Sequence, residues 1–255
     1  MIIIRSIAMS FAMFSRLPMP KMDWSNANMR YLLAALPLVG IVCGALLAGW
    51  AALCNILEFS SLLWAAGATV LPLLLTGGIH LDGLADTSDA LASHGDAQQK
   101  RAILKDPHAG AFAIIAVAVW LIWELAVYNE LPIADILLIA LIPICSRAEA
   151  AVLSLLLPSM AQEGLLTTFK GAADKTAALV ILLLFFAAAM VTAFLFSPVR
   201  AGFILAAGII SGAHTAIMSW RQFKGISGDI AGYCIEMTEL LMLTALMLCE
   251  KVVIL

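Results

Sequence analysis

Three aspartates recur at helical spacing in the most polar part of the sequence. Asp82, Asp86 and Asp89 are separated by four and then three residues, so on a helix they share one face. The same face is expected to continue through Ser93, Asp96 and Lys100. Stacked carboxylates repel one another by about a few tenths of a kcal/mol per pair, and a bound cation removes that cost. The spacing predicts a site for Mg²⁺, which keeps several waters and is completed by substrate phosphates; the alternative is an ordinary solvated acidic face.

Basic residues follow the aspartates closely. Lys100, Arg101 and Lys105 all lie within the segment from Gly77 to Gly110. A diphosphate ester bridged by Mg²⁺ needs such donors on its remaining oxygens. For Lys100 and Arg101 the alternative explanation is the general surplus of positive charge in cytoplasmic loops. The segment therefore predicts a metal-assisted phosphate site.

Arg147 lies inside a long apolar run, between Ser146 and Glu149. Placing an ionised side chain there costs roughly 2.5–3.5 kcal/mol, so it is a functional candidate by default. The structural alternative is an ion pair with Glu149 or Glu124. Two residues apart on a helix, Arg147 and Glu149 do not face each other. The spacing therefore favours a ligand or another helix as the partner of Arg147.

A second group of acids lies near the C-terminus. A turn-rich loop from Gly225 to Asp229 opens the last apolar run, and Glu236 and Glu239 follow within it. The spacing of seven and ten residues puts Asp229, Glu236 and Glu239 on one helix face. We expect this loop to lie on the same side of the membrane as Asp82.

The composition indicates which elements carry these residues. Hydrophobic residues make up 63% of the 255 positions and charged residues 12%, and the mean hydropathy is +1.03. A soluble domain of this size cannot hide so much apolar surface, and an apolar chain without alternating-strand patterns is expected to cross lipid as helices. The net charge of -3 with no basic block argues against nucleic acid as a partner. The five cysteines form no CxxC pair and are expected to be small buried hydrophobes.

The sequence predicts an all-α, polytopic transmembrane bundle of about seven spans and a single domain over residues 1–255. Apolar runs long enough to span occur at about 32–54, 60–78, 110–128, 132–157, 176–197, 201–220 and 233–253. Eleven Lys and Arg residues fall on one side of these runs and two on the other, which predicts a cytoplasmic N-terminus. Residues 1–20 are expected to form an interfacial or partly inserted helix ended by Pro18 and Pro20.

Several segments, taken in order, resemble one family along the whole chain. They are Phe14 to Pro20, Gly77 to Asp89 with its run from His80 to Asp86, Lys105-Asp106 with Gly110, Ser146-Arg147, and Gly228-Asp229 with Glu236 and Glu239. Together they are similar to the cobalamin synthase family, adenosylcobinamide-GDP ribazoletransferase.

The resemblance implies a transferase of a prokaryotic inner membrane with its active site facing the cytoplasm. It implies that α-ribazole, or its 5′-phosphate, is joined to adenosylcobinamide-GDP with release of GMP, and that Mg²⁺ is the metal. Which ribazole form is used, the number of metals, the identity of the base and the oligomeric state stay open.

The resemblance also implies roles for single residues. Asp82 and Asp86 would bind metal, Asp89 would be a third ligand or the base, and Glu236 would complete a second metal position with Asp229. The expected phosphate-binding pair of the catalytic group is Lys105 and Arg147. The expected substrate-binding residues are His80, Lys100, Arg101, Asp229 and Glu239.

Two other functions are considered. A cation-coupled transporter would use intramembrane charges as an ion path, but it should show repeated halves, and no repeat is visible. A CDP-alcohol phosphotransferase would require Asp three residues before the Asp-Gly pair and Ala-Arg three after it. Those places hold Ile79 and Asp86-Thr87, so this pattern fails.

Overall fold

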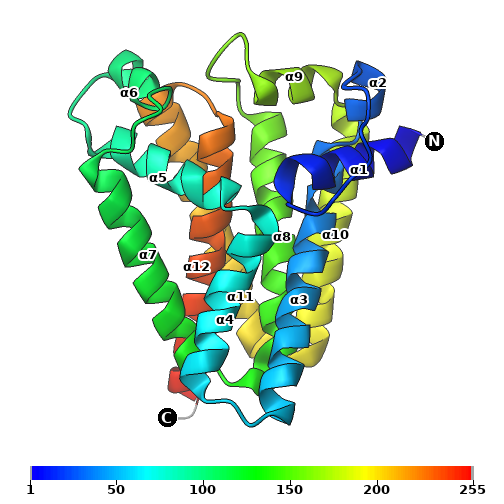
Figure 1. Ribbon diagram of the computed structural model, residues 1–255, viewed down its shortest axis with the longest axis vertical. Coiled ribbons are helices and arrows are strands. Elements are labelled where there is room, and N and C mark those ends of the chain that lie inside the picture. The colour runs from blue at the N-terminus through cyan, green and yellow to red at the C-terminus, as the bar shows by residue number, and fades with distance from the viewer. Residues whose placement is uncertain (1, 254–255) are drawn as a thin grey trace.

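The structure, a computed structural model that describes residues 2–253, is a bundle of long helices (Figure 1). In this part of the chain the one extended pairing is an isolated bridge between Ser159 and Ile226. The long helices that run between the two ends of the bundle are α3 (Leu36–Ile56), α4 (Ser61–Thr76), α7 (Ala111–Glu130), α8 (Ile136–Leu156), α10 (Lys175–Phe196), α11 (Pro198–Met218) and α12 (Gly228–Val253).

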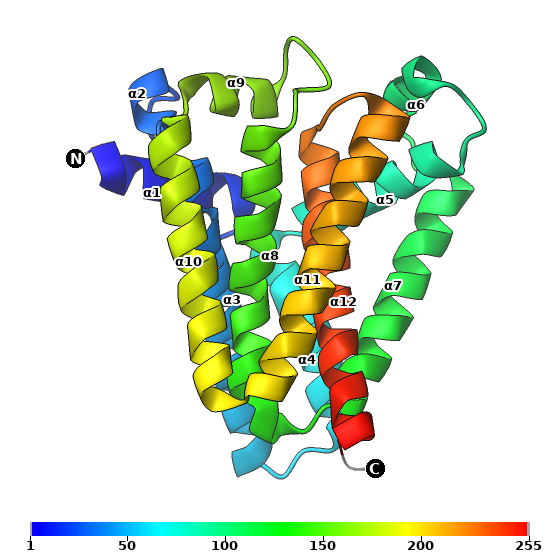
Figure 2. The same ribbon diagram turned by 180° about the vertical axis from the view of Figure 1, so that it is seen from behind.

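Shorter helices gather at one end of the bundle, where the described N-terminal segment also lies, as both ribbon views show (Figures 1 and 2). They are α1 (Ile2–Phe14), α2 (Asn26–Met29), η1 (Leu33–Ala35), α5 (Ile79–Ala92), α6 (Ala97–Ile103), α9 (Leu165–Ala172) and the π-helical turn η3 (Ser219–Phe223). These elements and their adjoining loops carry ten of the 14 Lys and Arg residues, and Lys175, the first residue of α10, is the eleventh at this end. We call this end the basic end. The turn η2 (Ile133–Asp135) and the C-terminal part of α12 lie at the other end.

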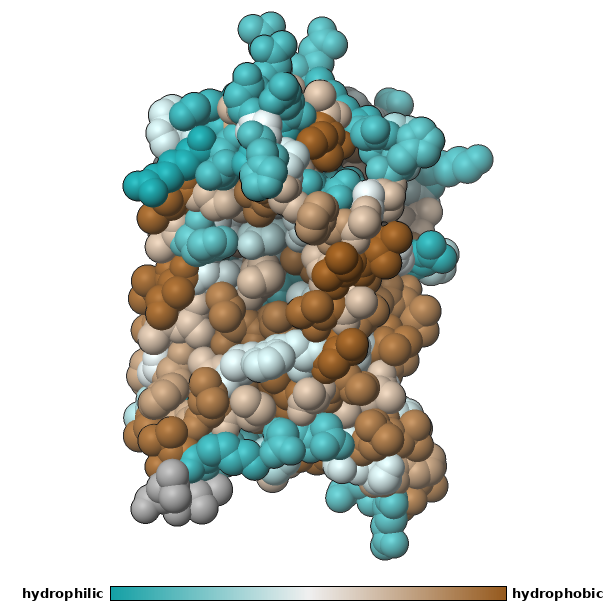
Figure 3. Space-filling view, turned by 90° about the vertical axis from the view of Figure 1, so that its left-hand side faces the viewer, coloured by the Kyte–Doolittle hydropathy of each residue, from teal (hydrophilic) through white to brown (hydrophobic). Residues whose placement is uncertain are grey.

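The prediction of a polytopic helical membrane protein is confirmed. Among the described helices, six are long and apolar enough to cross a membrane, and the bent pair of α4 and α5 adds a seventh if it is counted as one span. Figure 3 shows hydrophobic residues over the middle of one face, with hydrophilic residues gathered at the basic end and a narrower group near the opposite end. This distribution is that of a multi-pass membrane protein.

The break between α4 and α5 decides where the aspartates lie. The two helices meet at 94°, and both residues of the joint are glycines with positive φ, Gly77 at 71° and Gly78 at 76°. Glycine adopts this left-handed conformation without the steric cost that other residues meet. As a result, α5 runs across the basic end instead of continuing along α4 (Figure 1).

The predicted continuation of the aspartate stripe beyond Asp89 is wrong. Helix α5 ends at Ala92, and Ser93 already has an extended backbone. A new helix, α6, starts after Asp96, which caps it by accepting hydrogen bonds from the backbone N–H groups of Gln98 and Gln99. Asp96 therefore satisfies helix-end donors, and it does not extend the α5 face.

The segment after α1 holds the glycine joint in place. The backbone N–H of Arg16 donates to the Leu75 carbonyl at 2.7 Å, which satisfies one of the free carbonyls at the end of α4. The Arg16 side chain covers Gly77, where a Cβ atom would lie 2.5 Å from Arg16 Nε. Helix α1 ends at Phe14, four residues before Pro18.

Close helix packing orders the rest of the bundle. Gly40 and Gly44 of α3 lie against the backbone of α8 at Pro143 and Ala140, so closely that a Cβ atom would clash with either carbonyl oxygen. Small residues spaced four apart allow this approach between membrane helices. Helix α12 packs against α5, α8 and α11. The five cysteines are free and buried, as predicted.

Candidate active site

Helix α5 crosses the N-terminal part of α12 at two glycines. A Cβ atom on Gly83 would lie 2.5 Å from the Asp229 carbonyl oxygen, and one on Gly232 would lie 3.0 Å from the His80 carbonyl oxygen. The absence of side chains at both positions lets the two backbones touch. Asp82 and Asp229 are far apart in the sequence, and this crossing brings them next to each other.

The carboxylates at the crossing repel one another electrostatically. The pKa of Asp86 is raised to about 6, first by burial and then by repulsion from Asp82, Asp229 and Asp89. A raised pKa of this origin means that the site holds more negative charge than it can stabilise by itself. We call Asp82, Asp86 and Asp229 the carboxylate group.

Asp89 has a different environment. Its Oδ2 accepts a hydrogen bond from the Gly110 backbone N–H at 3.1 Å, and its carboxylate occupies the space where a side chain on Gly110 would be. Asp89 therefore ties α5 to the start of α7, and it lines neither cavity described below.

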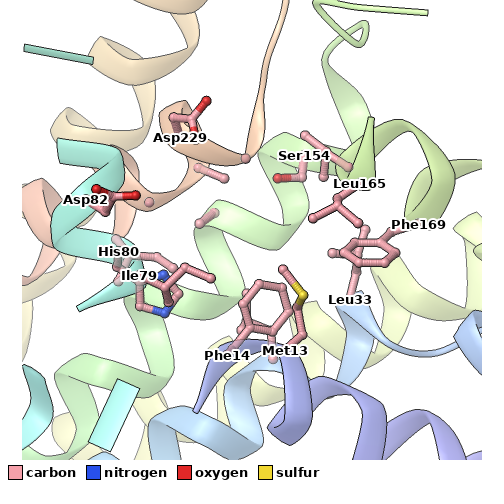
Figure 4. A pocket seen from close by; sticks show the side chains of 17 residues that line it. Met13, Phe14, Leu33, Ile79, His80, Asp82, Ser154, Leu165, Phe169 and Asp229 are labelled. Atoms are coloured by element: carbon pink, nitrogen blue, oxygen red, sulfur yellow. The ribbon is translucent and has the colours of Figure 1, made fainter. Parts of the chain in front are cut away.

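A cavity of about 180 Å³ lies beside the carboxylate group, and we call it the inner cavity. Figure 4 shows the side chains of Asp82 and Asp229 at one edge and those of Phe14 and Phe169 on another side. The lining residues are Met13, Phe14, Leu33, Leu36, Ile79, His80, Asp82, Ala150, Ser154, Leu165, Leu166, Phe169, Gly228, Asp229, Ala231, Gly232 and Ile235.

A second cavity of about 260 Å³, which we call the loop cavity, shares Asp229 with the first. Its lining includes Lys105, Glu163 and Ser227 from three loops. Backbone pairing fixes two of these loops together, because the Ile226 N–H donates to the Pro158 carbonyl at 2.9 Å. The structure thus brings the predicted Lys105 to a space that Asp229 also borders.

The neighbouring cations Lys100 and Arg101 have other partners. Lys100 Nζ donates to Gln222 Oε1 at 2.7 Å, and Arg101 Nε donates to the Phe223 carbonyl at 2.7 Å. Both bonds attach α6 to η3. Neither side chain lines the inner cavity or the loop cavity, so the structure does not bring them to the carboxylate group.

Arg147 is paired with another helix. It is 2% exposed and forms an ion pair with Glu239 of α12. Its guanidinium also donates to the Pro143 carbonyl at 3.1 Å, and Ser146 Oγ donates to Glu239 at 2.7 Å. Glu149, the alternative partner, instead accepts a hydrogen bond from Thr238. The partner of Arg147 is therefore a residue of another helix, one of the two kinds of partner that the sequence favours.

Glu236 lies deeper than Asp229. Seven residues of helix correspond to about 10 Å along its axis, and Glu236 is buried near Glu124, Glu239 and Arg147. The structure therefore does not bring Glu236 or Glu239 to Asp82 and Asp86. Over residues 2–253, no three His, Cys, Asp or Glu side chains are arranged to hold a metal by themselves.

The structure adds residues that the sequence did not single out. Phe14, Ser154 and Phe169 line the inner cavity from α1, α8 and α9. Phe14 belongs to a segment recognised only by family resemblance, and its ring stacks near His80 with centroids 6.0 Å apart. Ser154 and Phe169 carry no sequence signal, since a serine in an apolar helix and a phenylalanine in a short helix are both common.

Comparison with known proteins gives consistent matches along the chain. Residues 6–247 match a family model described as cobalamin-5-phosphate synthase. The adenosylcobinamide-GDP ribazoletransferase of Lachnoclostridium phytofermentans is 30% identical over 251 residues, which cover 98% of this chain and 96% of that protein. The enzymes of the same name from Clostridium perfringens and Geobacillus kaustophilus are 32% and 31% identical, covering 92% and 89% of this chain and 94% and 89% of their own lengths. No solved structure matches the chain.

Proposed function

The chain belongs to the cobalamin-5-phosphate synthase family, and we propose that it joins adenosylcobinamide-GDP to α-ribazole with release of GMP. The relatives named for this activity match over nearly the whole chain. The observation that carries the proposal is the crossing of α5 and α12, which sets Asp82 and Asp229 at the edge of the inner cavity.

Magnesium fits the donors at this crossing. Mg²⁺ takes one or two protein carboxylates and fills its other positions with water and substrate phosphates. Asp82 and Asp86, one helical turn apart on α5, provide two such oxygen donors. Burial, and then repulsion from the neighbouring carboxylates, raises the pKa of Asp86, and a bound cation would stabilise its ionised form. When bound, the metal would offset the negative charge of the diphosphate.

The reaction is a substitution at the phosphate attached to cobinamide. The 5′ hydroxyl of α-ribazole attacks this phosphorus, a new P–O bond forms, and the bond to GMP breaks. Asp229, which borders both cavities, accepts the hydroxyl proton as general base. Lys105 donates to phosphate oxygens from the loop cavity. Asp89 keeps α5 in register with α7, and Arg147 and Glu239 hold α8 to α12.

The distribution of Lys and Arg residues indicates which side of the membrane the carboxylate group faces. Eleven of the 14 Lys and Arg residues lie at the basic end, in its short helices, in the adjoining loops or at the first residue of α10. Positive charge is retained on the cytoplasmic side of inner membranes. We therefore assign the carboxylate group to the cytoplasmic side of a prokaryotic inner membrane. Phosphates would face the aqueous side there while the large apolar parts of the substrates stay near the lipid.

Purified protein in detergent or proteoliposomes tests the proposed reaction. With adenosylcobinamide-GDP, α-ribazole and Mg²⁺, equal amounts of GMP and adenosylcobalamin should form. Omission of either substrate should stop GMP release, which separates transfer from hydrolysis. No GMP in the complete mixture would refute the function. GMP release that persists after removal of divalent cations would refute only the metal requirement.

A further inference from the structure

We propose that the inner cavity binds the benzimidazole ring of α-ribazole and is the part of the site that selects nucleosides by their heteroaromatic ring. This inference rests on the proposed function, because it concerns one of the two substrates of that reaction. The occupant is a flat bicyclic heteroaromatic ring attached to ribose.

The size and lining of the inner cavity fit such a ring. Cavities of about 150 Å³ lined by apolar side chains hold a benzene ring, and the inner cavity measures about 180 Å³. Most of its wall is apolar, and two aromatic side chains face it, Phe14 from α1 and Phe169 from α9 (Figure 4). Aromatic rings stack on one another in this kind of enclosure. A corrin macrocycle is far too large for this space.

Besides the two aspartates at its edge, two polar side chains line the inner cavity, His80 and Ser154. His80 is 3% exposed, and its Nε2 has no hydrogen-bond partner within residues 2–253. Ser154 is buried on α8, and its hydroxyl points toward the middle of the cavity (Figure 4). Buried polar groups are normally satisfied. A benzimidazole nucleoside keeps one ring nitrogen with a free lone pair, which accepts a hydrogen bond from an imidazole N–H or a hydroxyl.

The position of the cavity gives the ring a role in the reaction. Asp82 and Asp229 lie at the edge of the inner cavity, so a base held inside would leave its ribose at the carboxylate group. The loop cavity, which Lys105 also lines, borders the same Asp229. The two substrates would therefore reach the carboxylate group from two adjoining cavities, the nucleoside from the inner cavity and the diphosphate from the loop cavity.

Inhibition of the unaltered protein by free heteroaromatic compounds tests which ring the inner cavity binds. Benzimidazole should inhibit GMP release by raising the KM for α-ribazole without changing the KM for adenosylcobinamide-GDP. Indole has nearly the same shape but no lone-pair nitrogen, and it should inhibit about tenfold more weakly, as expected for one lost hydrogen bond. The His80→Leu protein should lose this difference. Inhibition by benzimidazole that competes with adenosylcobinamide-GDP instead would overturn the inference.

A variant that fills the cavity gives an independent test. Ser154→Leu adds apolar volume from α8 and should raise the KM for α-ribazole by about tenfold or more, while the KM for adenosylcobinamide-GDP stays unchanged. Ala177→Leu is the matched control, because Ala177 lines a separate groove with Ile3, Ile7 and Phe185. An unchanged KM for α-ribazole in folded Ser154→Leu protein would overturn the inference. If that variant does not fold, the inhibition pattern of the unaltered protein decides the matter.

Binding without turnover separates this inference from the proposed function. The fluorescence of benzimidazole should change when it is titrated into the unaltered protein, and an excess of α-ribazole should reverse the change. No GMP release together with this reversible binding would refute the reaction and support the cavity assignment. GMP release without any binding of benzimidazole would support the reaction and overturn the cavity assignment.

Discussion

Replacing Gly83 by alanine should disable the site without removing any of its functional groups. An added Cβ would lie 2.5 Å from the Asp229 carbonyl oxygen and 3.0 Å from its Cα, whereas ordinary contact begins at 3.4 Å. These neighbours are backbone atoms and cannot rotate away, so the α5–α12 crossing must open by about 0.9 Å. Such overpacking costs about 1–3 kcal/mol, partly offset by the better helix propensity of alanine, about 1 kcal/mol.

The effect on activity should be larger than the effect on stability. A displacement of about 1 Å between reacting groups costs about 100-fold in rate, so kcat/KM for GMP release by Gly83→Ala should fall by about that factor. Gly202→Ala is the matched control, since nothing lies within 4 Å of a Cβ at this position on α11. Both variants are assayed by GMP release and thermal unfolding in detergent. Gly83→Ala protein with unaltered kcat/KM would refute the crossing as the device that positions the carboxylates.

Three further predictions concern charge. The pKa of Asp86 is raised from 3.8 to about 6, so its ionisation should destabilise the metal-free protein as pH rises through this interval. Mg²⁺ should therefore raise Tm more above pH 6 than below it. Asp86→Asn should abolish this difference. Arg147→Met leaves the Glu239 carboxylate buried without a cation and should lower the free energy of unfolding by about 3–5 kcal/mol, most of which a second change, Glu239→Gln, should restore. Lys105→Ala should raise the KM for adenosylcobinamide-GDP about tenfold, while Lys100→Ala should lower Tm and leave that KM unchanged.

The elements of the fold could be predicted because hydropathy determines which segments enter lipid. The predicted apolar run at 60–78 corresponds to α4, and the helical spacing of Asp82, Asp86 and Asp89 corresponds to α5. The bend between them was not predicted. Two consecutive glycines permit positive φ but do not require it, and the direction of α5 depends on contacts with Arg16 and α12 that are distant in sequence.

The site could be predicted only in part, because sequence patterns indicate the side of the membrane on which a residue lies but not its depth. Sidedness placed Asp229 at the same end as Asp82, and the structure brings them together. Helical periodicity grouped Asp229 with Glu236 on one face, but periodicity carries no information on depth, and Glu236 lies about 10 Å further along α12. The ion pair of Arg147 with Glu239 joins residues 92 positions apart, which spacing within one helix cannot reveal.

The metal dependence of GMP release by Asp82→Asn protein tests the central claim most directly. Asparagine keeps the size of the side chain and removes its charge, and Asp23→Asn, at an exposed position outside the helices, is the matched control. If Asp82 holds Mg²⁺ against the diphosphate, Asp82→Asn should lower GMP release by about 1,000-fold at saturating substrate and shift any residual activity to higher Mg²⁺ concentrations. Release at the unaltered rate, with unaltered Mg²⁺ dependence, would contradict the account.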